Sequence, residues 1–97
     1  MAKKLTEPEI AAQLPALAGW TRKGDAIEKS WTFTAFAEGI RFVDRVALAA
    51  DRADHHPDID VRWTTVTMRL STHSAGGLTA NDFRLAREID GLASGER

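Results

Sequence analysis

The sequence predicts an α+β fold, a two-layer sandwich in which one four-stranded antiparallel sheet carries three helices on one face. Hydrophobic residues repeat with helical or alternating period in the order α-β-β-α-β-β-α, and the connections within each strand pair are short enough for antiparallel hairpins. With 97 residues the chain has room for a single domain, which we expect to span residues 1–97.

Composition narrows the classes of function. Hydrophobic residues make up 43% of the chain and charged residues 28%, as in ordinary globular proteins. Thirteen Lys and Arg against fourteen Asp and Glu give a net charge of -1, which argues against a nucleic-acid partner. The absence of cysteine excludes disulfides, thiolate nucleophiles and cysteine-ligated zinc. No apolar run reaches the ~18 residues of a membrane span and no signal peptide is present, so we expect a cytoplasmic protein without a membrane partner.

The first expected element is a helix within LTEPEIAAQLPALAGW, residues 5–20. Thr6 can cap its N-terminus and Glu9 stands at the third position of a capping box, while a proline is tolerated in the first turn. Pro15 and Gly19 end the helix.

A hairpin is expected next, around Lys23–Asp25. Ile27, Trp31 and Phe33 fall on one face of its second strand. Lys29 interrupts that apolar alternation, because it takes a position on the same face.

Helical periodicity then runs from Thr34 to about Ala53, with a wide apolar stripe that favours packing against a sheet. The stripe comprises Phe36, Ile40, Phe42, Val43, Val46, Ala47, Ala49 and Ala50. Pro57 disfavours the α conformation at His56, so this helix has to end before His56.

The second hairpin is expected to follow Pro57. Alternating apolar positions are Ile59, Val61 and Trp63 on one strand and Val66, Met68, Leu70 and Thr72 on the other. The alternation favours a two-residue turn at Thr64–Thr65, although this dipeptide lacks the Asn or Gly typical of such turns. In that register Ile59 lies opposite Leu70 and Trp63 packs in the core.

The last expected helix begins after Leu78. Thr79 can cap it, Asp82 takes the third position of a capping box, and Leu78 and Phe83 have the spacing of a hydrophobic staple. Its expected buried face comprises Leu85, Ala86, Ile89, Leu92 and Ala93.

The predicted register brings the histidines together. Continued by two steps, it sets His56 opposite His73 at a Cβ separation of about 5 Å. His55 adjoins His56, and a short glycine-containing loop after His73 could fold Asp82 back over the same corner. We therefore expect an acid-base cluster at one end of the sheet, because imidazoles titrate near neutral pH.

Each of these residues also has a structural explanation. His55 could be a cation at a helix end, and Asp82 a capping carboxylate. A solvated acidic edge would account for Asp51, Asp54, Asp58 and Asp60. A zinc site is less consistent with the sequence, because adjacent histidines diverge and no His-x-x-x-His spacing is present. No Gly-x-Ser-x-Gly elbow supports a nucleophilic triad.

The spacing of these residues resembles the signature of the pterin-4a-carbinolamine dehydratase family. The anchors are Asp51, His55, His56, Pro57, Trp63, His73 and Asp82. The phrases EGIRFVDRVALAADRADHHPDI and VTMRLSTHSAGGLTANDFRLA are similar to that family as well, and the resemblance covers residues 20–86. Departures are small: Asp51 stands where the family often has Glu, and Asp54 where Asn is common.

The resemblance implies the same α+β fold and adds a reaction. Members dehydrate 4a-hydroxytetrahydropterin to quinonoid dihydropterin and water, with no metal and no cofactor. Carried over by motif, the catalytic residues are His55, His56 and His73, with Asp82 in support. The pterin would contact His55, His56, Pro57, Thr72, His73, Ser74 and Ala75. The assignment of acid and base among the histidines stays open.

Two other classes of function remain beside the dehydratase. Relatives of this fold can act as dimerisation or partner-binding modules without turnover, and a small metal-dependent hydrolase is the other alternative; the intact histidine set favours the enzyme. A homodimer or homotetramer is expected, because the family forms both and the sheet has an exposed edge. The sequence decides neither between these two states nor the side chain of the pterin.

Overall fold

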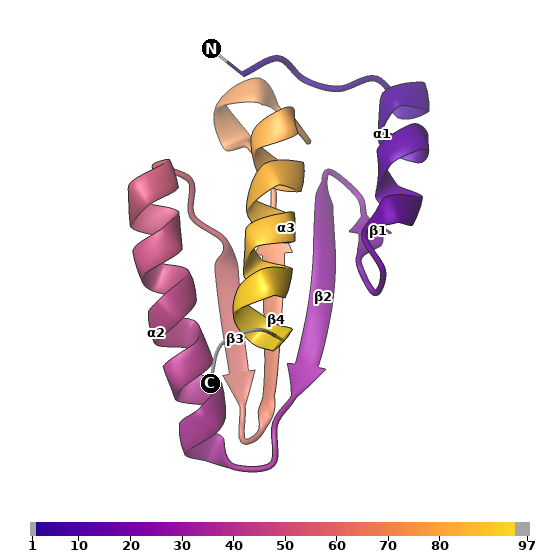
Figure 1. Cartoon of the computed structure of the whole chain (residues 1–97). Helices are drawn as coiled ribbons and strands as arrows, with labels where there is room; N and C mark the ends of the chain where they lie inside the picture. The colour runs from indigo at the N-terminus through magenta and orange to yellow at the C-terminus, as the bar shows by residue number, and fades with distance from the viewer. Residues whose placement is uncertain (1, 95–97) are drawn as a thin grey trace.

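A computed structural model describes residues 2–94 and shows the predicted element order (Figure 1). One antiparallel sheet has the strand order β1-β2-β4-β3. Its strands are β1 (Thr21–Lys23), β2 (Ala26–Thr32), β3 (Asp58–Arg62) and β4 (Thr65–Leu70). The helices are α1 (Glu7–Gln13), α2 (Phe36–Ala53) and α3 (Ala80–Ser94), with 3-10 turns η1 (Leu14–Ala16) and η2 (His73–Ala75). Among these residues, no helix is long and apolar enough to cross a membrane.

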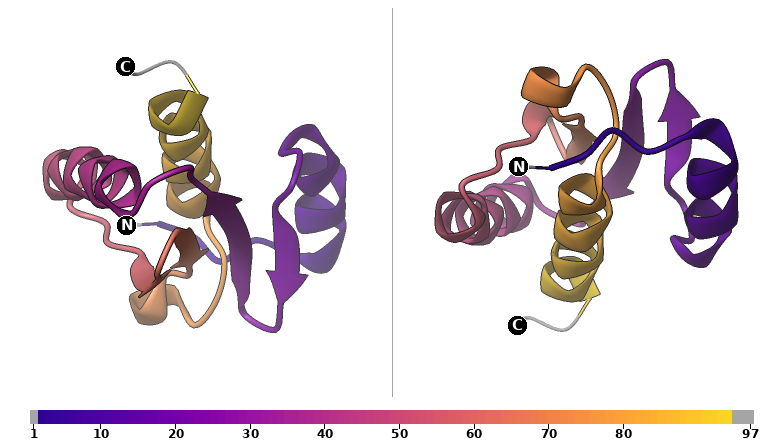
Figure 2. Two further views of the ribbon diagram at one scale, coloured as in Figure 1. Left: turned by 90° about the horizontal axis from the view of Figure 1, so that it is seen from below. Right: turned by 90° about the horizontal axis from the view of Figure 1, so that it is seen from above.

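The helices lie over one face of the sheet (Figure 2). There α2 and α3 lie side by side, and α1 lies beside β1 at the edge. Val66, Met68 and Leu70 of β4 are fully buried toward the helices, while the alternate side chains of the strand face away. The buried cluster comprises Ile10, Leu17, Trp20, Ile27, Phe42, Val46, Ala49, Val66, Met68, Leu70, Leu78, Phe83, Leu85, Ala86 and Ile89.

The predicted capping box of α1 is confirmed. Thr6 Oγ1 accepts a hydrogen bond from the backbone N–H of Glu9, and Glu9 Oε1 accepts one from the backbone N–H of Thr6. This backbone donor at Thr6 holds the pKa of the Glu9 carboxyl below its usual value. Arg22 of β1 forms a two-pronged ion pair with Glu7, which ties α1 to the edge of the sheet.

Lys29 does not break the pattern of β2. It lies on the covered face with Ile27 and Trp31, and its Nζ donates to Asp90 of α3 at 2.8 Å. The indole N–H of Trp20 donates to the same carboxylate at 3.1 Å. The lysine thus occupies an inward position because a carboxylate on the facing helix compensates its charge.

The buried face of α2 is narrower than predicted. Phe42 and Val46 are fully buried, but Phe36 is 52% exposed and Ala47 is also exposed. Within residues 2–94, α3 is the helix with which α2 packs most extensively, and the flank that carries Phe36 stays half exposed.

The turn between β3 and β4 differs from the prediction. It consists of Trp63 and Thr64, so that Arg62 pairs with Thr65, whereas the sequence favoured a turn at Thr64–Thr65. Neither dipeptide contains the Gly or Asn that marks two-residue turns, so turn chemistry could not place it.

The shifted turn changes the strand register by two residues. Ile59 lies opposite Met68 rather than Leu70. The predicted pairing of His56 with His73 is therefore wrong, because both lie beyond the paired residues and the register no longer points one at the other.

Trp63 is not a core residue. Its side chain is 80% exposed at the tip of the hairpin, and its φ angle is 51°. A bulky residue with positive φ is a strained exception, whereas Asn adopts this conformation readily.

We expect Trp63→Asn to raise the free energy of unfolding by about 0.5–1 kcal/mol, because Asn relieves the backbone strain and little packing is lost. Chemical denaturation would measure it. Trp63→Phe keeps the strained conformation and should match the wild type; a Trp63→Asn protein no more stable than this control would contradict the explanation.

Candidate active site

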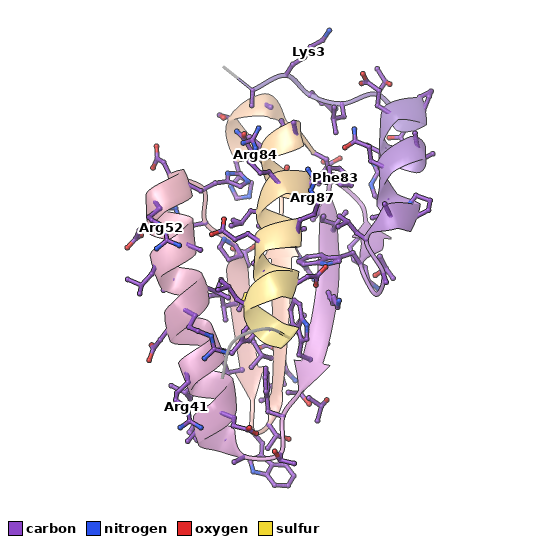
Figure 3. All side chains as sticks on the ribbon, viewed as in Figure 1. Lys3, Arg41, Arg52, Phe83, Arg84 and Arg87 are labelled. Carbon is purple, nitrogen blue, oxygen red and sulfur yellow. The ribbon has the colours of Figure 1, made fainter. Side chains whose placement is uncertain are left out.

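The predicted site residues lie at one end of the sheet, where the C-terminus of α2, the start of β3, the end of β4 and the N-terminus of α3 meet (top of Figure 1). Phe83, labelled in Figure 3, is fully buried in the first turn of α3 and anchors this end of the helix in the core. Arg52 near the end of α2 pairs with Glu88 of α3 at 3.4 Å, which links the two helices.

The end of α2 positions His55. The helix stops at Asp54, which takes a left-handed conformation with φ 51° and ψ 43°. The backbone N–H of His55 then donates to the carbonyl of Ala50, five residues earlier in the chain, as in a Schellman motif. Pro57 follows and prevents the helix from resuming, as predicted.

The start of α3 positions Asp82. Thr79 caps the helix through Oγ1, which accepts the backbone N–H of Asn81 at 3.2 Å. The backbone N–H of Thr79 donates to Asp82 Oδ2 at 2.9 Å, so the predicted capping role of Asp82 is confirmed. The side chain of Asp82 is 0% exposed, so the cap is also a buried carboxylate.

His55 and Asp82 are in direct contact. His55 Nε2 and Asp82 Oδ1 are 2.5 Å apart, and the His55 side chain is only 13% exposed. The other carboxylate oxygen accepts a hydrogen bond from the hydroxyl of Thr72 at 2.8 Å. The buried carboxylate of Asp82 thus contacts the His55 imidazole through one oxygen and accepts hydrogen bonds from Thr72 and Thr79 through the other.

His56 has a different partner and a different environment. Its Nε2 lies 3.0 Å from Asp51 Oδ1, and the side chains are 58% and 74% exposed. Asp51 was expected to belong to a solvated edge; it is solvated, but it also contacts the histidine across the end of α2. Adjacent histidines therefore point to separate carboxylates.

His73 lies on a tight loop between β4 and α3. Thr72 and Gly77 pair through two backbone hydrogen bonds of 3.0 and 3.3 Å, which close the loop around η2. Gly76 has φ 77°, a conformation that glycine tolerates without strain. The loop exposes His73, while Thr72 beside it is buried.

A shallow hollow of about 510 Å³ opens beside His73. Its lining residues are Lys23, Asp25, Ala26, Asp58, Arg69, Ser71, His73, Gly76 and Gly77. Arg69 and Asp58 pair across β3 and β4 and face away from the helices, so the hollow lies on the uncovered face of the sheet. His55 and Asp82 lie on the covered side, and the segment Ser71–His73 runs between the two.

A larger hollow, of about 660 Å³, lies at the opposite end of the sheet, near Arg41 in Figure 3. Its lining contains no histidine, and its carboxylate, Glu38, accepts a hydrogen bond from the Thr34 hydroxyl at 2.6 Å. That bond lowers the pKa of Glu38, so this carboxylate is a poor proton carrier at neutral pH.

The structure thus assembles the predicted residues only in part. It joins His55 to Asp82, but no hydrogen bond connects any two histidines within the described chain. Nor does any group of three His, Asp or Glu side chains in residues 2–94 have a geometry suited to a metal ion.

Sequence reasoning missed the second role of Thr72. It was expected to contact the pterin, but its side chain is 7% exposed and bonds to Asp82 and Thr79. Thr72 follows Met68 and Leu70 at every second position, and this alternation predicts that its side chain points into the protein rather than toward a ligand.

Comparison with known proteins decides the family. The family described as Pterin 4 alpha carbinolamine dehydratase matches residues 3–92. The chain belongs to this family. A protein of Nocardia farcinica, provisionally named a pterin-4-alpha-carbinolamine dehydratase, is 57% identical over 89 residues, 92% of this chain and 94% of its own. A relative from Roseiflexus sp. with the same provisional name is 51% identical over 93% of this chain and 97% of its own.

Solved structures agree with the dehydratase family fold. A transcriptional coactivator/pterin dehydratase from Brucella melitensis superposes with a TM-score of 0.91 at 35% identity, over 95% of this chain and all of that one. A pterin dehydratase-like protein described as a RuBisCO assembly factor in the alpha-carboxysome gives a TM-score of 0.64 at 24% identity, over 77% and 87% of the two chains. The second likeness shows the fold alone.

The two adjacent histidines of this dehydratase-family chain should differ in their contribution to stability. His55→Ala removes a partner from a fully buried carboxylate, so the free energy of unfolding should fall by roughly 1–3 kcal/mol. His56→Ala breaks an exposed pair and should cost less than about 0.5 kcal/mol. Urea denaturation at neutral pH measures both; equal losses would contradict the difference in burial.

Proposed function

We propose that this chain dehydrates 4a-hydroxytetrahydropterin to quinonoid dihydropterin and water through acid-base catalysis by its histidines. The observation that carries the proposal is the buried contact between His55 and Asp82, at the same end of the sheet as the His73 loop, in a member of the carbinolamine dehydratase family. The reaction would serve to recycle tetrahydropterin.

The chemistry needs one base and one acid. The base takes the proton from N5, and the electrons of the N5–H bond form the C4a=N5 double bond. The C4a–O bond breaks at the same time, and the acid protonates the departing oxygen to give water. Imidazoles suit both tasks, because they exchange protons near neutral pH.

His55, His56 and His73 supply these groups in the proposal, and Asp82 supports His55. The base candidate is His55, whose ring is held by a carboxylate. The acid candidate is His73, which is exposed beside the hollow on the uncovered face. His56 with Asp51 would bind or orient the ring.

The pterin would lie across the end of the sheet, between the segments His55–Pro57 and Thr72–Ala75. The hollow beside His73 offers charged and hydroxyl groups for a polar heterocycle, including Asp58 and Ser71. Thr72 would take part through its backbone, since its hydroxyl is engaged with Asp82.

The oligomeric state belongs to the proposal as well. β3 has a partner on one side only, so its outer backbone groups are available to a second copy. A homodimer or homotetramer stays a prediction, to be measured by light scattering.

Purified protein should accelerate the dehydration of synthetic 4a-hydroxytetrahydropterin, followed by ultraviolet absorbance. His73→Ala should lower kcat by about 10²–10⁴-fold, the usual contribution of a general acid or base. Asp44→Asn, an exposed change in the middle of α2, is the control and should keep the wild-type rate.

A wild-type protein that leaves the spontaneous rate unchanged would refute the proposal. Stable capture of a protein partner by such an inactive chain would favour the partner-binding alternative, for which the Brucella coactivator/dehydratase provides a precedent in name.

A further inference from the structure

Two threonine hydroxyls form a chain of hydrogen bonds that ends on Asp82. Thr72 follows β4, and Thr79 caps α3, and their side chains are 7% and 0% exposed. Their oxygen atoms are 2.8 Å apart, and Thr72 Oγ1 is also 2.8 Å from Asp82 Oδ2. Both hydroxyls are thus engaged within the protein.

The donation from Thr72 to Asp82 sets the direction of the other bonds in the chain. The hydroxyl hydrogen of Thr72 points to Asp82 Oδ2, so Thr72 Oγ1 has to accept the hydrogen of Thr79. Thr79 Oγ1 can then only accept from its other neighbour, the backbone N–H of Asn81. Every donor therefore points toward the carboxylate of Asp82.

Asp82 is the acceptor in each of its bonds to these two threonines. Its Oδ2 receives two donors, Thr72 O–H and Thr79 N–H, at the first turn of α3. Oδ1 is left to accept a hydrogen from His55 Nε2.

We propose that Thr72 and Thr79 are positioning residues that fix the tautomer of His55. The hydroxyl chain holds Asp82 as an acceptor, keeps the His55 hydrogen on Nε2, and leaves Nδ1 as the basic nitrogen. No residue of the described chain bonds to Nδ1, so it is free to take a proton. The role of Nδ1 as the catalytic base rests on the proposed function, whereas the tautomer of His55 does not.

Helix capping alone does not account for Thr72. The capping box of α3 uses Thr79, Asn81 and Asp82, all within or next to the helix. Thr72 lies outside it, after β4, and contributes a hydroxyl at a buried position where valine has the same shape. This hydroxyl connects the loop that carries His73 to Asp82, the carboxylate that contacts His55.

The wild-type protein alone gives the first test. With ¹⁵N-labelled histidine at about pH 8.5, where an ordinary imidazole is neutral, the ring-nitrogen shifts of His55 should show hydrogen on Nε2 and a bare Nδ1. Hydrogen on Nδ1, or on both nitrogens, would overturn the proposal. This result does not depend on turnover or on any variant.

Substitutions at Thr72 give the second test. Thr72→Val keeps the shape but removes the donor, so His55 should become a mixture of tautomers and kcat should fall about 10–100-fold, with KM changed less than about threefold. Thr72→Ser keeps the donor and should restore the single tautomer and most of kcat.

Thr65→Val is the matched control, because it removes a threonine hydroxyl at the far end of β4 whose one partner among residues 2–94 is Thr32. It should keep both the tautomer and kcat. If Thr72→Val retains the wild-type tautomer, or if Thr72→Ser loses it as fully as Thr72→Val, the hydroxyl has no positioning role. An inactive wild type with the expected tautomer would reject the dehydratase and leave this inference standing.

Discussion

The end of the sheet that carries the histidines depends on the burial of one carboxylate. Asp82 has no exposed surface, and an ionised carboxylate without partners would be very costly in such a place. Its partners come from three places in the chain: the end of α2, the loop that follows β4 and the cap of α3. Each partner is therefore held in position by the same side chain, and loss of any one would leave the buried Asp82 with one hydrogen bond fewer.

Local backbone geometry makes these contacts possible. The left-handed Asp54 ends α2 so that the next residue, His55, turns back toward the sheet. The backbone pair between Thr72 and Gly77 closes the loop on the other side, with Gly76 in a conformation that suits glycine. The site is thus built from two helix ends and one closed loop, with rigid elements behind each.

The sequence predicted those parts of the fold that depend on local patterns. The capping residues Thr6 and Thr79, the end of α2 before His56 and the element order all follow from neighbouring residues. The register of β3 and β4 could not be found in the same way. A shift of two residues leaves every side chain on the same face, so hydrophobic alternation fits both registers equally well.

The same limit explains the prediction for the histidines. Their gathering was predicted from a strand register that is two residues from the observed one, and their contacts depend on register and on loop closure, which the pattern of apolar residues does not encode. Lys29 shows the same dependence on distant contacts. Its charge interrupts the apolar alternation of β2, and the carboxylate that compensates this charge, Asp90, lies 61 residues away on α3.

An asymmetry between the two adjacent histidines follows from this geometry and bears on the chemistry. Both Nε2 atoms meet a carboxylate, but one pair is shielded from water and the other is not. Solvent screens the exposed pair and allows its geometry to vary, whereas the buried pair retains a strong and directed interaction. A proton transfer that needs a fixed ring nitrogen is better served by His55, and a contact that adapts to the incoming substrate is better served by His56.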